Sequence, residues 1–128
     1  MREGGASVLL PIQRSEARYF TMDLYLRFGT RSKDLEAAKS IICELLDIAM
    51  ELRDSSYWGG DYYLARAGQS FAKSIKLHSN TDLHDQKPIF PEYAEFGALL
   101  HCDCVSDERI LKERLDASSF EFIGRTEV

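Results

Sequence analysis

Two cysteines and a histidine lie close together in the second half of the sequence and invite comparison with metal sites. The spacing Cys102-x-Cys104 places both thiols on one side of an extended strand, whereas His101 points to the other side. A tetrahedral zinc site needs two further ligands, and the sequence has no second C-x-x-C and no H-x-x-x-H spacing. Because a free cysteine packs as a small apolar residue, we expect buried thiols and no bound metal.

Three histidines, His78, His84 and His101, are the side chains best suited to act as a general base near neutral pH. None has a sequence neighbour that resembles a nucleophile with its orienting group, and no serine lies in a Gly-x-Ser-x-Gly turn. The Gly59-Gly60 pair is not followed by a Lys-Ser or Lys-Thr helix start, so both common phosphate-binding fingerprints are missing. We therefore expect no catalytic residue and no cofactor.

Composition indicates a single globular domain over residues 1–128, with residues 1–17 as a loosely held lead-in. Asp and Glu number 21 against 16 Lys and Arg, and the net charge of -5 opposes binding to nucleic acid and to anionic membranes. No apolar run has the length of a membrane span or of a signal-peptide core. With an odd number of cysteines as well, we expect a cytoplasmic protein with reduced thiols.

The elements that must position these side chains follow from hydrophobic periodicity. Apolar residues alternate from Arg18 to Phe28, which predicts a strand, and recur at spacings of three and four from Ser32 to Arg53, which predicts a long helix. Segments 62–67 and 71–78 indicate a hairpin. The remaining expected elements are an irregular stretch suited to a binding loop (79–97), a strand (98–105), a helix opened by Ser106-Asp107-Glu108 and a closing strand (120–123).

This order of elements predicts an α+β fold of the ferredoxin-like type. A strand that returns through a helix to run parallel in the same sheet places that helix on a fixed side, so two such units carry both helices on one face. We expect a two-layer sandwich with a mostly antiparallel sheet of about four or five strands and two helices on one face. Leu24, Leu26 and Phe28 would face the helices, and alternate residues would line an uncovered sheet face.

The uncovered sheet face raises the question of RNA binding, because RNA-recognition domains share this fold and stack bases on aromatic residues of the sheet. Tyr19 and Tyr25 would point outward there, with Arg27 nearby. The Lys/Arg-Gly-Phe/Tyr-Gly/Ala-Phe motif of those domains is absent, and the chain is acidic. We therefore expect no nucleic-acid partner.

Aromatic and acidic residues favour a protein partner instead. Tyrosines and a tryptophan gather around residues 57–63, and these residue types anchor protein interfaces. The long helix carries an acidic stripe opposite its apolar one, as any solvated helix can. The residues expected to contact a basic partner are Glu36, Glu44, Asp47, Glu51, Trp58, Asp61, Tyr62 and Tyr63.

One run of residues also carries a resemblance. The run Tyr57-Trp58-Gly59-Gly60-Asp61-Tyr62-Tyr63, followed by a strand pair, an acidic loop with prolines and the closing run 120–123, resembles small bacterial proteins associated with toxin immunity. The resemblance implies a cytoplasmic antitoxin-like protein that occludes a cognate effector, often a cationic nuclease, and performs no chemistry itself. It assigns no individual site residue.

Two functions from different classes follow. The first is a non-enzymatic immunity protein whose acidic helix face and aromatic turn cover a basic toxin. The second is a homodimer whose open sheet faces enclose a pocket for a small ligand or substrate. Hydrogen bonding between His101 and Asp103 would favour acid–base chemistry in that pocket. Its expected lining is Tyr19, Thr21, Asp23, Tyr25, Arg27, His101 and Asp103.

Overall fold

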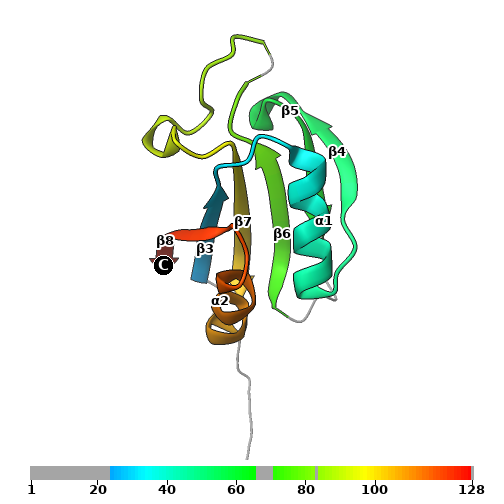
Figure 1. Cartoon of the computed structure of the whole chain (residues 1–128), viewed down its shortest axis with the longest axis vertical. Helices are drawn as coiled ribbons and strands as arrows, with labels where there is room; N and C mark the ends of the chain where they lie inside the picture. Colours follow the sequence, from blue (N-terminus) through cyan, green and yellow to red (C-terminus); the bar gives the residue numbers. More distant parts are fainter. Residues whose placement is uncertain (1–23, 66–70, 83, 128) are drawn as a thin grey trace, which may run out of the picture.

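The computed structural model describes residues 24–65, 71–82 and 84–127, which form a six-stranded sheet and two helices (Figure 1). The helices are α1 (Leu35–Leu46) and α2 (Glu108–Asp116), and the short 3-10 helices are η1 (Ser56–Trp58) and η2 (Pro91–Tyr93). The expected lead-in at 1–17, and the expected strand and pocket residues within 18–23, lie outside the described residues. The strands are β3 (Leu24–Thr30), β4 (Glu51–Ser55), β5 (Gly60–Ala65), β6 (Ala72–Ser79), β7 (Ala98–Val105) and β8 (Glu121–Glu127).

Every pairing between the described strands is antiparallel, in the order β4-β5-β6-β7-β3-β8. Strands β7 and β8 therefore run the same way on either side of β3, and α2 connects them. Strands β3 and β4 also run the same way, but β5, β6 and β7 lie between them in the sheet. The α+β class with an antiparallel sheet and two helices is confirmed. The sheet has six strands instead of four or five, and the ferredoxin-like arrangement is not confirmed.

Helix α1 is shorter than its hydrophobic period predicts. Asp34 caps it by accepting a hydrogen bond from a backbone N–H of the first turn at 3.1 Å. The helix ends because Asp47 takes a left-handed conformation with φ 55°, in which a helix cannot continue. The predicted helix over Ser32–Arg53 is therefore wrong beyond Leu46, and Glu51 lies in strand β4 instead.

Both helices pack against the same sheet face and share one hydrophobic core (Figure 1). The prediction that Leu24, Leu26 and Phe28 face the helices is confirmed, because all three are buried in this core. Leu52 lies within the stretch whose spacing predicts a helix, but it is 58% exposed on the edge strand β4. The other fully buried core residues include Ile42, Leu46, Ile75, Leu77, Leu100, Leu111 and Leu115.

Helix α2 begins where the sequence predicts. Asp107 caps it by accepting a hydrogen bond from the Ile110 N–H at 3.1 Å, and Leu111 and Leu115 face the core. Neither helix of the described residues has the length and apolar character that crossing a membrane requires.

Candidate functional site

The sheet face opposite the helices, here called the outer face, carries polar residues from three neighbouring strands. Arg27 of β3 pairs with His101 of β7, which pairs in turn with Lys76 of β6. Asp103 and His78 lie on the same face, two residues further along their strands, because side chains two positions apart share a face. The alternation of the strands therefore gathers these side chains on one surface.

Arg27, His101 and His78 form a chain of hydrogen bonds across the outer face. The Arg27 Nε–H donates to His101 Nδ1 at 3.1 Å, so this nitrogen carries no proton. A neutral His101 then carries its proton on Nε2 and donates it to His78 Nε2, 2.8 Å away. His78 completes the chain by donating from Nδ1 to the Ser79 carbonyl at 2.8 Å. All four imidazole nitrogens are therefore engaged, and both tautomers are fixed.

Burial keeps both imidazoles neutral. It lowers the pKa of His78 to about 4, although the hydrogen bond to the Ser79 carbonyl acts in the opposite direction. Burial also lowers the pKa of His101 to about 3, and the nearby His78, Arg27 and Lys76 add to this effect. At neutral pH neither histidine offers an unoccupied nitrogen to a substrate or to a metal ion.

Aromatic side chains from two loops cover the histidine pair. The Trp58 ring of η1 lies 4.7 Å from the His78 ring and 5.2 Å from the His101 ring, measured between centroids. The Phe90 ring lies 5.7 Å from His78 and 5.3 Å from His101. These side chains form a second, smaller packed group, which we call the Arg–His cluster: Arg27, Trp58, His78, Phe90 and His101.

One side chain, Asn80, organises the loop that brings Phe90 onto the outer face, and it is only 2% exposed. Its Nδ2 group donates to the carbonyls of Phe90, Tyr93 and Phe96 at 3.4, 2.9 and 3.3 Å. Its Oδ1 accepts from the Phe90 N–H at 2.9 Å. Hydrogen bonds from both polar atoms of the Asn80 side chain therefore hold the loop in place.

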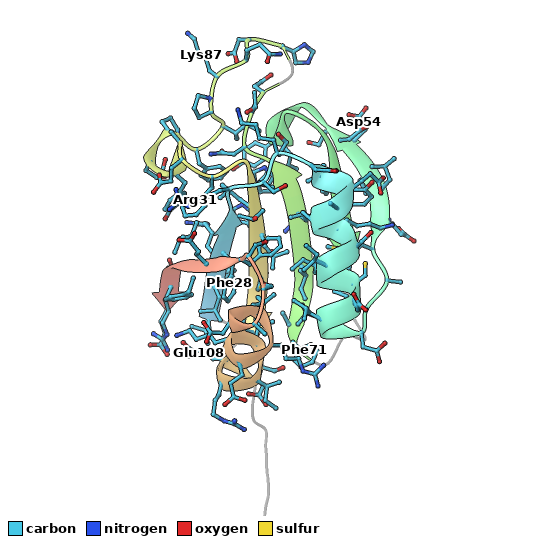
Figure 2. The ribbon with its side chains drawn as sticks, in the orientation of Figure 1. Phe28, Arg31, Asp54, Phe71, Lys87 and Glu108 are labelled. Carbon is cyan, nitrogen blue, oxygen red and sulfur yellow. The ribbon has the colours of Figure 1, made fainter. Side chains whose placement is uncertain are left out.

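Glycines let the base of this loop lie directly on the sheet. A Cβ at Gly29 would come within 2.7 Å of the Phe96 ring, and one at Gly97 within 2.4 Å of the Ser32 carbonyl oxygen. Any larger residue would push the loop away. The tip of the loop extends beyond the end of the sheet, where Lys87 is exposed (Figure 2). The stretch predicted as a binding loop thus has an anchored base and an exposed tip.

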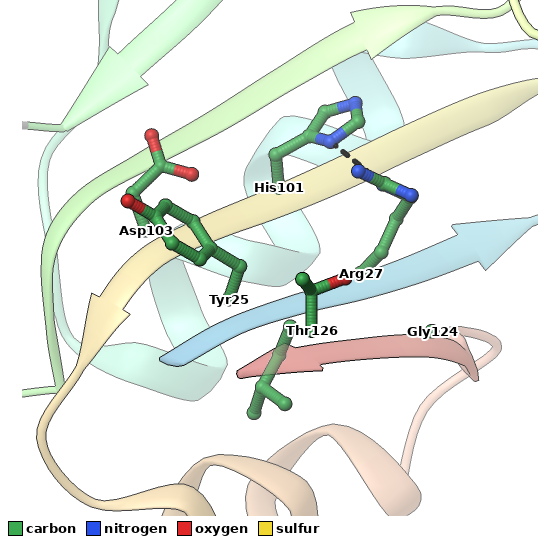
Figure 3. Close-up of a pocket in the computed structure, with 7 residues that line it drawn as sticks. Tyr25, Arg27, His101, Asp103, Gly124 and Thr126 are labelled. Carbon is green, nitrogen blue, oxygen red and sulfur yellow. Dashed lines mark hydrogen bonds between the residues drawn. The ribbon is translucent and has the colours of Figure 1, made fainter. Parts of the chain in front are cut away.

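A half-open hollow of about 320 Å³ lies beside the Arg–His cluster, between β3, β7 and β8 (Figure 3). Arg27 and His101 lie together on one side of it, and Asp103 lies on the other. Every described residue of the predicted pocket lines this hollow, but His101 makes no hydrogen bond with Asp103. The lining residues are Tyr25, Leu26, Arg27, His101, Asp103, Gly124 and Thr126.

Asp103 has partners of its own on β6. Its Oδ2 atom accepts from Ser74 Oγ at 3.0 Å and from Lys76 Nζ at 2.6 Å. Both side chains of this ion pair are about three-quarters buried, since 24% and 27% of their surfaces are exposed. Lys76 is therefore neutralised locally, whereas no carboxylate of the described residues pairs with Arg27.

The aromatic residues predicted to bind a partner lie on both sides of the sheet. Trp58 and Tyr62 contact each other on the outer face, with ring centroids 6.2 Å apart. Tyr63 points to the helix side, where it is only 6% exposed and belongs to the core. Its hydroxyl donates to Glu36 on α1, and this bond is the main reason that the pKa of Tyr63 rises to about 12. The predicted set does not form one continuous surface.

The remaining acidic members of that set are exposed. Glu44 lies on the solvent side of α1 and Asp47 follows its last turn, as the sequence predicts. Glu51 lies on β4, where it forms an ion pair within its own strand at 2.6 Å. Asp61 on β5 pairs with Asp54 of the edge strand β4. Figure 2 labels Asp54 on that edge. The role of these carboxylates in partner binding stays a prediction.

The strand cysteines have separate environments. Cys102 is fully buried in the core, and burial strongly raises the pKa of its thiol. Cys104 is partly exposed, with a left-handed φ of 54°. Within the described ranges, no three His, Cys, Asp or Glu side chains come together as metal ligands.

Sequence reasoning missed the roles of His78, Asn80 and Phe90. The contact between His78 and His101 depends on the pairing register of β6 and β7, which local patterns do not give. The alternation of Ser74, Lys76 and His78 along β6 was an available signal that polar residues share the outer face. No sequence pattern around Asn80 or Phe90 indicates that the loop folds back over the sheet.

The geometry of the outer face suits binding better than catalysis. Both histidines are neutral and fully engaged, and neither hydrogen-bonds a serine hydroxyl or a thiol among the described residues. What the face presents is one oriented cation beside a hollow. Comparison of the chain with protein-family models, with curated proteins and with solved structures finds no match.

Proposed function

We propose that this chain is a non-enzymatic binding protein that takes a small ligand into the hollow between β3, β7 and β8. One observation carries the proposal: an arginine fixed by a neutral histidine lines a half-open hollow of about 320 Å³. Ligand pockets in proteins typically measure roughly 300–1,000 Å³ and combine apolar walls with a few oriented polar groups. The hollow meets both criteria within one chain, so a dimer is not required to form it.

Preorganisation supports the same function. The Arg–His cluster fixes Arg27 before any ligand arrives, which reduces the entropy lost on binding. Burying such polar groups adds little net stability compared with apolar residues of similar size. The arrangement is thus better explained by recognition than by folding.

The test is a fragment screen by NMR on the full chain and on a variant whose hollow is blocked. Gly124→Leu suits this purpose, because a Cβ at Gly124 comes no closer than 3.4 Å to its nearest neighbour, Tyr93 Oη. The larger side chain then occupies the hollow that Gly124 lines. Ala37→Leu, on the exposed side of α1, is the matched control.

The proposal predicts fragments that shift resonances of residues lining the hollow, in the parent chain and in Ala37→Leu but not in Gly124→Leu. Fragments that bind all three proteins equally, or a screen with no binder at the hollow, would count against it.

A protein partner is a second proposal, favoured by a different observation. Glu44 and Asp47 are exposed at the C-terminal end of α1, and the last turn of this helix contains no basic residue. Combined with the net charge of -5, this surface would attract a basic protein. The resemblance to immunity proteins and a cytoplasmic location belong to this proposal, and the three free cysteines support that location.

Charge reversal tests the second proposal. In pull-downs from the native cell extract, a basic partner should be captured by the parent chain, and less so by the Glu44→Lys, Asp47→Lys double variant or at raised salt. Capture that ignores both changes would exclude an acidic docking face on α1.

A further inference from the structure

Arg27 has one hydrogen-bonding edge fixed and one edge open. Its Nε–H is held by His101 Nδ1 at 3.1 Å. The guanidinium carbon lies 5.6 Å from the centre of the Phe90 ring and 5.8 Å from that of Tyr93, so aromatic side chains also confine the group. The two terminal nitrogens have no acceptor among the described residues. They form the fork that pairs with planar oxyanions in proteins.

The charges around the hollow leave Arg27 unmatched. An arginine stays protonated at neutral pH, and both neighbouring histidines are neutral. Lys76 is already paired with Asp103 at 2.6 Å. One positive charge therefore faces the hollow without a described counter-ion, in a chain whose net charge is -5.

Asp103 restricts the anion that can enter. Its carboxylate lines the same hollow, so a ligand with two negative charges on one group would be repelled more than a ligand with one. Ser74 and Lys76 both bond to Oδ2, and no hydrogen bond found among the described residues uses Oδ1. That oxygen can accept a hydrogen bond from a ligand. His101 and Asp103 are two residues apart on β7, which separates their backbones by about 7 Å.

We propose that the ligand is a small amino carboxylate, whose carboxylate pairs with the Arg27 fork and whose amine donates to Asp103 Oδ1. The carboxylate and the amine lie at opposite ends of the ligand, because Arg27 and Asp103 lie on opposite sides of the hollow (Figure 3). This inference rests on the proposed function and names the ligand class for the same hollow. His78 is a positioning residue outside the hollow. His101 lines the hollow, but both of its ring nitrogens are already engaged, so it orients the guanidinium and offers the ligand no hydrogen bond.

The experiment titrates the full chain with amino carboxylates of increasing chain length, each beside its carboxamide counterpart. Amide and arginine Nε resonances report binding and its location. A carboxylate of matching length should bind about tenfold or more tightly than its amide, the difference expected for a charge-assisted pair. Arg27→Gln should abolish this preference, and Arg27→Lys should retain part of it because the charge stays while the fork is lost.

Two further variants separate the roles. Asp103→Asn should weaken amino carboxylates but strengthen the corresponding carboxylates without an amine, because it removes a negative charge from the hollow and leaves Lys76 without its ion-pair partner. Arg31→Gln is the matched control, because it removes an exposed guanidinium that pairs with Glu121 outside the hollow. Arg31→Gln should change neither the preference for carboxylates over carboxamides nor the preference for ligands that carry an amine.

The outcomes distinguish the two levels of the proposal. Equal binding of carboxylates and amides at the hollow would overturn the ligand class and leave the binding function standing. Tighter binding of phosphate esters than of carboxylates would also overturn the ligand class and leave the binding function standing. If no probe and no fragment binds at the hollow, both proposals fail.

Discussion

The two faces of the sheet are built from the same strands but packed in opposite ways. On the helix side, neighbouring strands contribute Leu26, Ile75 and Leu100 to a continuous apolar core. On the outer face, the next residues along are Arg27, Lys76 and His101. Arg27 donates a hydrogen bond to His101, and Lys76 forms an ion pair with Asp103. Because strand alternation fixes both faces at once, a single strand such as β7 serves folding on one side and recognition on the other.

Stability and specificity come from different faces of the sheet. Apolar burial on the helix side contributes in proportion to the area removed from water. The outer face instead buries polar groups, which must all find partners and which stabilise the fold only modestly. Changes to the helix side should therefore act mainly on stability, and changes to the outer face on the orientation of Arg27.

The largest effect is expected from emptying the core. Leu99 and Leu100 are adjacent and both 0% exposed, but they lie on the outer face and the helix side respectively. Leu100→Ala should cost about 4 kcal/mol of unfolding free energy, in the upper range for such truncations. Leu99→Ala should cost less, about 2 kcal/mol, and should also perturb the histidine resonances. Urea denaturation measures both free energies. Equal costs would show that the outer face contributes as much to stability as the helix side.

Acid should destabilise the outer face before the helix side. Unfolded histidines have a pKa of about 6.5, whereas the folded values are about 4 for His78 and about 3 for His101. Between the folded and the unfolded pKa values, the unfolded state binds more protons than the folded state. The contribution of the neutral histidines to the unfolding free energy is therefore complete above about pH 6.5 and is lost as the pH falls. Between about pH 7 and pH 5 the loss should reach ~4 kcal/mol for the two histidines together.

The matching measurement is urea denaturation across this pH range. The His78→Gln, His101→Gln double variant should show a flatter profile. A parent chain whose stability did not change over this range would contradict the neutral pair.

Loosening the loop should have an intermediate effect. Asn80→Ala removes four hydrogen bonds that hold Phe90, Tyr93 and Phe96, and should cost about 2 kcal/mol. Amide exchange of the loop should rise more than that of α1. Uniform acceleration across both would show that the loop and the core unfold together.

The smallest effect is expected at a helix terminus. Asp107→Ala removes the cap of α2 and should cost about 1 kcal/mol by thermal or urea denaturation. The histidine resonances should stay unchanged, because α2 packs on the other side of the sheet. Altered tautomers in this variant would link the two faces.

Much of the fold follows from periodicity alone, and the exceptions have physical reasons. The alternation along β3 and β7 gives the core side of each strand, and it also brings Tyr25, Arg27, His101 and Asp103 together. The end of α1 could not be predicted, because apolar residues keep a helical spacing after Asp47 has turned the chain. The left-handed residue that ends a helix is more often glycine, so Asp47 did not indicate a helix end in the sequence.

The rest of the site depends on contacts between distant segments. His78 meets His101 through the register of β6 and β7, and Trp58 and Phe90 arrive from loops. Neither register nor loop closure leaves a local pattern in the sequence. Strand alternation therefore predicted that Tyr25, Arg27, His101 and Asp103 share the outer face. It did not predict the hollow within one chain beside β8, nor the cluster that orients Arg27.

The most direct measurement is a long-range proton–nitrogen NMR spectrum of the two buried imidazoles at neutral pH. We expect two neutral rings of opposite tautomer, with the proton on Nε2 in His101 and on Nδ1 in His78. A protonated ring, or a His101 that carries its proton on Nδ1, would contradict it, because Arg27 could then no longer be held in place facing the hollow.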